Sequence, residues 1–117
     1  MTDQEVFTTV ARHLLKQGKK SVDLFDSCRC LYRDERDRKC AIGCLIPDDL
    51  YHATMENLNV VELSSEFGSI RQLFEGLSID LLEELQTIHD RKAVSDWGEL
   101  LKIIAVKFNL KWELENE

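Results

Sequence analysis

Residues 28–47 read CRCLYRDERDRKCAIGCLIP, and the fold class that we predict depends on them. Two short apolar segments flank the charged run DERDR at 34–38, a pattern typical of a β-hairpin. The tip lacks the Asn-Gly or Asp-Gly pair of a two-residue turn, which indicates a longer loop. Pro47 lacks an N–H group for a strand ladder, so we expect the second strand to end there.

Helical patterns lie on both sides of this predicted hairpin. Thr2 or Asp3 is a suitable N-cap for a first helix, and Gly18 is a suitable left-handed residue at its end. The apolar face of this helix comprises Val6, Phe7, Val10, Ala11, Leu14 and Leu15. We expect residues 21–27 to form a connector that packs Val22, Leu24 and Phe25 onto the core.

Three further helices are expected after the hairpin. A short one begins at Ser64 or Ser65 and ends at Gly76, and the state of Val60–Val61 before it stays open between extended chain and loop. Ser78 and Ser95 are suitable caps for two longer helices, with apolar stripes within 79–88 and 97–108. The prediction is a single α+β domain, residues 1–117, mainly helical with about four helices and one β-hairpin after the first helix.

Composition fits an ordinary globular domain, with 44% hydrophobic and 32% charged residues. No apolar run approaches the length of a membrane helix, and Asp3 and Glu5 do not suit a secretion signal. The net charge of −7 is uneven: residues 1–44 carry nine Lys/Arg against seven Asp/Glu, and the remainder six against fifteen. This acidity disfavours nucleic-acid binding and suits a basic protein partner, although solubility alone also accounts for it.

Two sequence patterns resemble small, uncharacterised proteins of tailed bacteriophages and prophages. One runs Cys-x-Tyr-Arg from Cys30 and continues Lys-Cys-Ala-Ile-Gly-x-Leu-Ile-Pro-Asp from Lys39; the other is Leu-Gln-x-Ile-His-Asp, residues 85–90. The family's hairpin tip often holds a Gly-Pro-Asp-Gly-type turn, whereas this chain has Asp-Glu-Arg-Asp at 34–37. The resemblance implies a phage accessory protein acting in the cytoplasm of the bacterial host, and it carries no catalytic residues over.

Four cysteines fall within this region, with the spacing C-x-C-x9-C-x3-C. Zinc sites usually pair cysteines two to four residues apart, so the spacing fits zinc poorly. We expect reduced thiols that pack as small apolar side chains, and no cofactor. A metal- or ligand-binding module is the alternative, with Cys28, Cys30, Cys40 and Cys44 as its ligands.

His89 and Asp90 are the other residues with chemical potential, since Cys, His and Asp together can form a nucleophile, a base and an orienting group. A histidine near a helix end, however, interacts favourably with the helix dipole, and an aspartate there bonds the following turn. No helix N-terminus or glycine-rich elbow activates a thiol, so we predict that the protein is not an enzyme. The last two helices can pass for a helix-turn-helix, but Asp96 and Glu99 oppose DNA binding by them.

The charged tip is the best local candidate for a protein-binding site, because Arg and Tyr are enriched at binding hot spots. We predict a phage-encoded, non-enzymatic accessory protein that binds and modulates a bacterial host protein, such as a defence or nucleic-acid-processing factor, with inhibition as the expected form of modulation. We expect this protein to make no direct contact with nucleic acid or membrane. The last apolar stripe fits a core or a second subunit, so a homodimer stays an alternative. The candidate partner-binding residues are Tyr32, Arg33, Asp34, Glu35, Arg36, His89 and Asp90.

Overall fold

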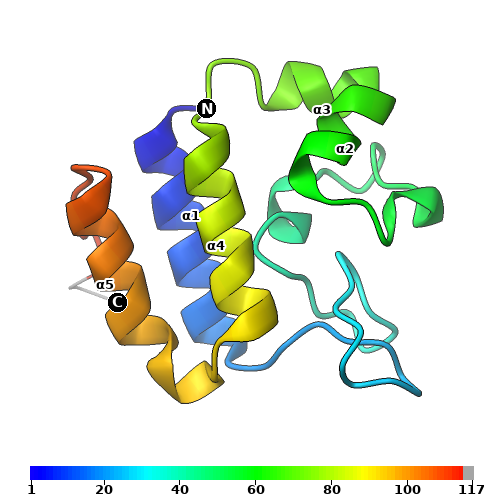
Figure 1. The fold of residues 1–117 in the computed structure, drawn as a ribbon, viewed down its shortest axis with the longest axis horizontal. Coiled ribbons are helices and arrows are strands. Elements are labelled where there is room, and N and C mark those ends of the chain that lie inside the picture. Colours follow the sequence, from blue (N-terminus) through cyan, green and yellow to red (C-terminus); the bar gives the residue numbers. More distant parts are fainter. Residues whose placement is uncertain (115–117) are drawn as a thin grey trace.

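A computed structural model describes residues 1–114, which form an all-helical domain measuring 35 × 32 × 21 Å. Helices α1 (Asp3–Gln17), α4 (Ile79–Arg91) and α5 (Trp97–Lys107) pack against one another (Figure 1). The short helices α2 (Val60–Glu66) and α3 (Gly68–Leu73) cover one end, and α2 contacts α4. Between α1 and α2 the chain is irregular apart from two 3-10 turns, Gly43–Leu45 and Ala53–Met55.

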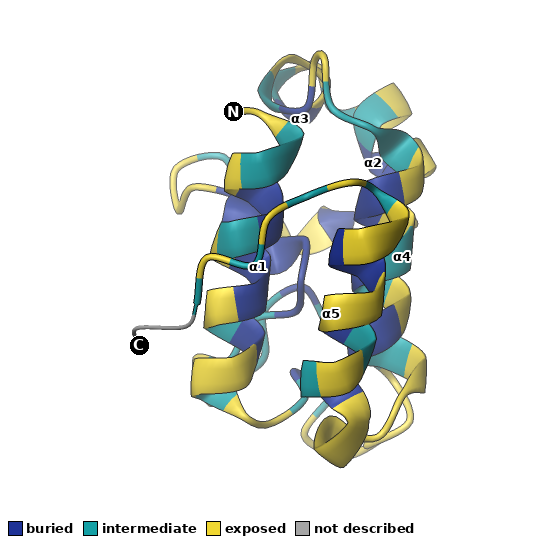
Figure 2. Cartoon of the chain, turned by 90° about the vertical axis from the view of Figure 1, so that its left-hand side faces the viewer, coloured by how far each residue is buried: buried dark blue, intermediate teal, exposed yellow. Residues whose placement is uncertain are grey.

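The first helix confirms its predicted ends. The Thr2 hydroxyl accepts the Glu5 amide at 3.1 Å, and the Glu5 carboxylate accepts the Thr2 amide at 2.9 Å, which completes a capping box. Gly18 ends the helix at φ 61°, a conformation that glycine adopts at little cost. The predicted apolar face is buried except for Leu15, and Figure 2 shows the buried stripe of this helix facing α4 and α5.

Helix α4 begins where the sequence predicts, whereas α5 does not. Ser78 caps α4 by accepting the Leu81 amide at 3.2 Å. The cap predicted at Ser95 is wrong, because residues 94–96 form a 3-10 turn that leads directly into α5. Trp97 is fully buried, and its indole N–H donates to the Lys92 carbonyl at 3.2 Å, which fixes the turn between the two helices.

The predicted β-hairpin, and with it the α+β class, is wrong. In residues 1–114 only two isolated β-bridges occur, Val22 with Cys30 and Arg33 with Lys39, and neither extends into a sheet. The expected second strand is instead a helical turn, in which the Cys44 amide donates to the Cys40 carbonyl at 3.1 Å. Residues 40–43 are buried in succession, so their apolar run lacks the alternation that marks a half-exposed strand.

Close contact between two backbone segments explains the helical turn. A Cβ atom on Gly43 would lie 2.0 Å from the Tyr32 carbonyl oxygen, so only glycine fits at this position. The Cys40 amide donates to that same carbonyl at 3.2 Å. That hydrogen bond belongs to the Arg33–Lys39 bridge, and the turn that begins at Cys40 packs against the Tyr32 carbonyl instead of extending this pairing into a strand.

Other expectations in the connecting segments also change. Leu24 and Phe25 do not pack on the core, since Leu24 is 41% and Phe25 92% exposed. Residues 60–66 form α2, which starts earlier than the helix predicted at Ser64 or Ser65 because Asn59 and Glu62 build a second capping box. No helix among residues 1–114 has the length and apolar character needed to cross a membrane.

Candidate functional site

The four cysteines do not converge on a common point. Cys28 is exposed, Cys40 is fully buried, and Cys30 and Cys44 are half-buried. In residues 1–114, one group of three or more potential metal ligands has its ligand atoms within 4.8 Å, and it comprises Cys30, His89 and Asp90. Burial raises the pKa of the Cys44 thiol to about 12, and it also raises that of Cys40. The arrangement does not support the four-cysteine metal site.

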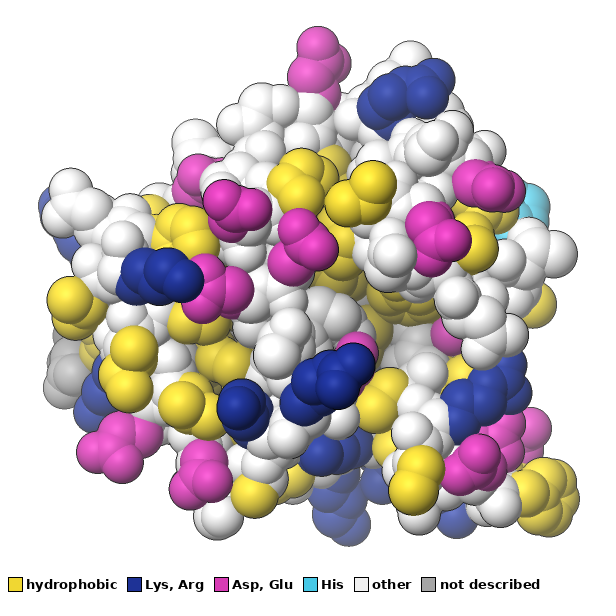
Figure 3. All heavy atoms as spheres, in the orientation of Figure 1, with side chains coloured by type: hydrophobic (Ala, Val, Ile, Leu, Met, Phe, Trp, Pro, Cys, Tyr) yellow, Lys and Arg dark blue, Asp and Glu magenta, His cyan; other side chains and the backbone are white. Residues whose placement is uncertain are grey.

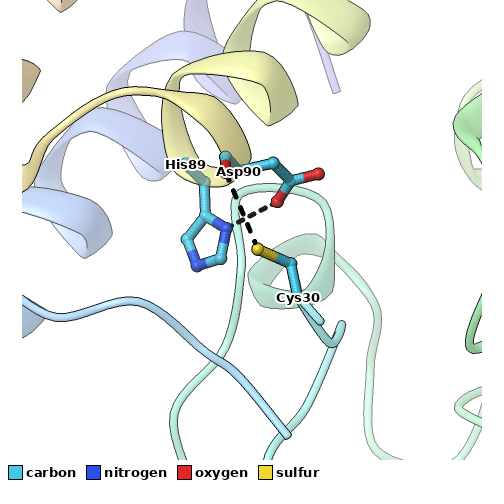
Figure 4. A group of neighbouring side chains, drawn as sticks. All are labelled: Cys30, His89 and Asp90. Carbon is cyan, nitrogen blue, oxygen red and sulfur yellow. Dashed lines mark hydrogen bonds and ion pairs between the residues drawn. The ribbon is translucent and has the colours of Figure 1, made fainter. Parts of the chain in front are cut away.

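The cluster of Cys30, His89 and Asp90 joins the irregular segment to the end of α4 (Figure 4). His89 is fully buried, and its Nε2 accepts the backbone N–H of Ser21 at 2.9 Å. Because an amide can only donate, Nε2 carries no proton, and the proton of the neutral ring lies on Nδ1. Nδ1 accordingly donates to Asp90 Oδ1 at 2.7 Å, an oxygen that also accepts the Gln86 amide at 2.8 Å.

This hydrogen bonding leaves His89 without a free lone pair. A metal at Nδ1 would require a proton on Nε2, where it would point at the Ser21 N–H group. His89 also cannot act as a base for Cys30, because neither of its ring nitrogens has a free lone pair. Burial, followed by the nearby Asp90, raises the pKa of the Cys30 thiol to about 11, the opposite of what a nucleophilic cysteine needs. The cluster thus joins the irregular segment to the end of α4, and it does not suit metal binding or catalysis.

The predicted binding residues of the charged tip separate into internal and exposed groups. Tyr32 is buried, and its hydroxyl donates to the Leu58 carbonyl. The Arg33 guanidinium lies 4.6 Å from the centre of the Tyr51 ring and contacts Asp48 at 2.8 Å. Asp34 is internal as well, and only Glu35 and Arg36 of the predicted tip residues are exposed.

Asp34 organises the tip. Its carboxylate accepts the amides of Arg36 at 2.9 Å and Arg38 at 2.8 Å, and it pairs with the Arg38 guanidinium at 2.8 Å. Burial raises the pKa of Asp34, but these hydrogen bonds outweigh that effect and lower it overall. The side chain is 1% exposed, so Asp34 has a structural role and is not available to a partner.

Glu56 has a comparable role that the sequence analysis missed. Its carboxylate accepts the amides of Tyr32 at 2.8 Å and Arg33 at 3.3 Å, together with the Tyr51 hydroxyl at 2.6 Å. Nothing in the local pattern marks this residue, because its partners lie at least five positions away in the sequence. Glu56 therefore holds Tyr32, Arg33 and Tyr51 together around one carboxylate.

A groove of about 740 Å³ lies beside α4, and we call it the α4 groove. Figure 3 shows it as a hollow between α4 and the segments to its right. It is bordered by three parts of the chain: Cys28, Cys30, Leu31 and Tyr32; Asn57, Leu58, Asn59, Val60 and Glu62; and Glu83, Gln86, Thr87, Asp90 and Arg91 of α4. Of the predicted binding residues, Tyr32 and Asp90 line it, whereas His89 is not among its lining residues.

Charge in the α4 groove is predominantly negative. Glu62 and Glu83 are exposed, and Asp90 is partly exposed, against the single cation Arg91 among the lining residues. Asp90 Oδ1 is held by two donors, while its other oxygen points away from His89 (Figure 4). The groove thus presents an acidic surface with a fixed carboxylate at its wall.

Comparisons with protein-family models, curated proteins and solved structures find no match to this chain.

Proposed function

We propose that this chain is a phage-encoded accessory protein that binds and inhibits a protein of the bacterial host, and that the α4 groove is its contact surface. The α4 groove is the single observation that carries the binding role, since it brings three distant segments into one hollow. Hollows of this size usually hold small ligands, and a side chain of a partner protein can fill such a hollow as an interface anchor. The resemblance to phage proteins supports the proposed origin.

Binding is favoured over chemistry by the state of the groups nearest the groove. Cys30 has a raised pKa, and both nitrogens of His89 are already hydrogen-bonded. A general base needs a free lone pair within reach of its substrate, and a nucleophile needs an accessible thiolate. The groove therefore offers shape and charge for recognition and no activated group.

The charge of the groove indicates the kind of host protein. Three carboxylates line it against one arginine, and the chain carries −7 overall. Such a surface attracts a basic partner and speeds the encounter with it. A nucleic-acid-processing factor presents that kind of basic surface, so competition by duplex DNA for the partner is an informative second measurement.

A pair of matched variants tests the groove. Thr87→Arg places a long cation at the exposed wall, whereas Thr9→Arg makes the same change on an exposed position of α1, away from the groove. Each variant and the wild type serve as bait in bacterial lysate, with quantitative mass spectrometry of the retained proteins. We expect a host protein that wild type and Thr9→Arg retain and that Thr87→Arg loses by about tenfold. Equal retention by all three baits would refute the groove as the contact surface.

A further inference from the structure

The loop at residues 23–26 presents two apolar side chains to solvent. Phe25 is 92% exposed, the highest exposure among the large hydrophobic residues that the structure describes, and Leu24 beside it is 41% exposed. Aspartates at 23 and 26 flank the pair. Exposed aromatic residues are enriched at the centres of protein interfaces, where they act as anchors.

The loop is held in one conformation by its own hydrogen bonds. The Phe25 amide donates to Asp23 Oδ1 at 2.9 Å, and the Cys28 amide donates to Asp26 Oδ1 at 3.0 Å. The Asp23 amide donates to the Arg29 carbonyl at 2.8 Å, which closes the base of the loop. A side chain presented on a fixed loop loses less conformational entropy on binding than one on a mobile loop.

Arg29 connects this loop to the α4 groove. Its guanidinium pairs with Asp23 at 2.9 Å and donates to the side-chain oxygen of Asn57 at 3.1 Å. Asn57 belongs to the groove wall, and so does Cys28, which lies two residues after Asp26. The apolar loop and the acidic groove are therefore parts of one continuous surface.

We propose that Leu24 and Phe25 insert into an apolar pocket of the partner, and that the partner surrounds this pocket with Lys and Arg side chains that enter the α4 groove. This inference rests on the function proposed above and specifies the chemistry of the partner. Leu24 and Phe25 would contribute to binding by filling a pocket that excludes water, and the groove carboxylates would attract cationic side chains of the partner. Arg29 adds no net positive charge to the surface because Asp23 already pairs with it.

Site-specific photo-crosslinking tests the inference. Three proteins each carry p-benzoylphenylalanine at one position: Phe25 in the loop, Thr87 in the groove, or Val106 on α5 as the control. Val106 is 82% exposed and lies on the helix at the other side of the molecule (Figure 1), so it matches Phe25 in exposure but not in place. Each protein is irradiated in bacterial lysate, and the joined peptides are identified by mass spectrometry.

We expect positions 25 and 87 to join the same host protein and position 106 not to join it. Links from position 25 should fall on apolar residues with Lys or Arg nearby, and their yield should drop severalfold between about 0.05 M and about 0.5 M salt as charges are screened. Phe25→Ser should weaken capture of that protein by about tenfold, while Val106→Ser leaves it unchanged. Both sites are exposed, so neither change should alter the melting temperature.

The outcomes separate this inference from the proposed function. Links at position 87 without links at position 25 would overturn the anchor and leave the groove as the contact surface. Links at position 25 to a segment without Lys or Arg, or with a yield that salt does not change, would overturn the partner chemistry. Equal labelling at all three positions, or none at positions 25 and 87, would overturn both.

Discussion

Replacement of Gly43 by alanine is the most direct test of how the irregular segment is built. The added Cβ would lie 2.0 Å from the Tyr32 carbonyl oxygen and 2.9 Å from its carbonyl carbon. Ordinary van der Waals contact begins at 3.4 Å, and the obstructing atoms belong to the backbone. The two segments must therefore move apart by more than about 1 Å, since the atoms in the way are backbone atoms and no side chain can rotate to make room.

That separation sets the size of the expected effect. Overpacking in a close-packed interior costs about 1–3 kcal/mol. The hydrogen bond from the Cys40 amide to Tyr32, now 3.2 Å long, would also lengthen, which adds about 1 kcal/mol. We expect Gly43→Ala to lower the free energy of unfolding by about 2–4 kcal/mol in total.

Urea denaturation followed by circular dichroism measures this change through the midpoint and slope of the transition. Gly98→Ala is the matched control, because its Cβ would meet only Leu15 at 3.9 Å and the position lies inside α5. This control should gain up to about 1 kcal/mol from helix propensity. If Gly43→Ala were as stable as the wild type, the close packing of these backbones would be refuted.

Three further predictions follow from individual side chains. His89→Ala should lower the free energy of unfolding by about 3 kcal/mol, because it leaves a cavity and an unpaired Ser21 amide; a urea midpoint unchanged from wild type would contradict the network. Burial lowers the pKa of His13 in the folded state, so just below pH 6.5 only the unfolded chain gains a proton on this side chain. The free energy of unfolding should therefore fall as the pH drops from 6.5 toward the folded-state pKa. His13→Gln should reduce the slope of that fall, and an equal slope in both proteins would exclude His13 as its source. A thiol reagent at about pH 8 should label one cysteine rapidly, since Cys28 is exposed while the pKa of Cys30 is about 11, and Cys28→Ser should abolish the rapid phase; a second fast thiol in that variant would argue against the burial of the others.

The sequence predicts the long helices because their signals are local. Thr2, Gly18 and Ser78 act within a few residues of the helix ends that they define. The segment from Cys40 to Cys44 escapes this reasoning, since an apolar run that is buried on all sides has the same pattern in a strand and in a helical turn. At the tip, the Asp34 carboxylate accepts the amides of Arg36 and Arg38, so a side chain organises the turn between the two apolar segments.

The candidate site was less predictable for a related reason. His89 and Asp90 are recognisable as a pair, but the amide that fixes the state of the ring belongs to Ser21, 68 positions earlier. The α4 groove depends on three segments that meet only after folding. Phe25 shows the limit of hydrophobicity as a guide, because apolar character alone does not tell a core residue from one that faces solvent.

The irregular part of the chain holds its shape differently from a sheet, because it is fixed by single side chains, those of Asp34, Glu56 and His89. Each of these side chains fixes its neighbours mainly through hydrogen bonds to their backbone amides, so the exposed side chains between these contacts take little part in holding the shape. Positions such as Glu35, Arg36 and Phe25 can then be exchanged singly without disturbing the packing of α1, α4 and α5. A chain built this way can change the chemistry of its exposed surface by one substitution at a time and keep its fold throughout.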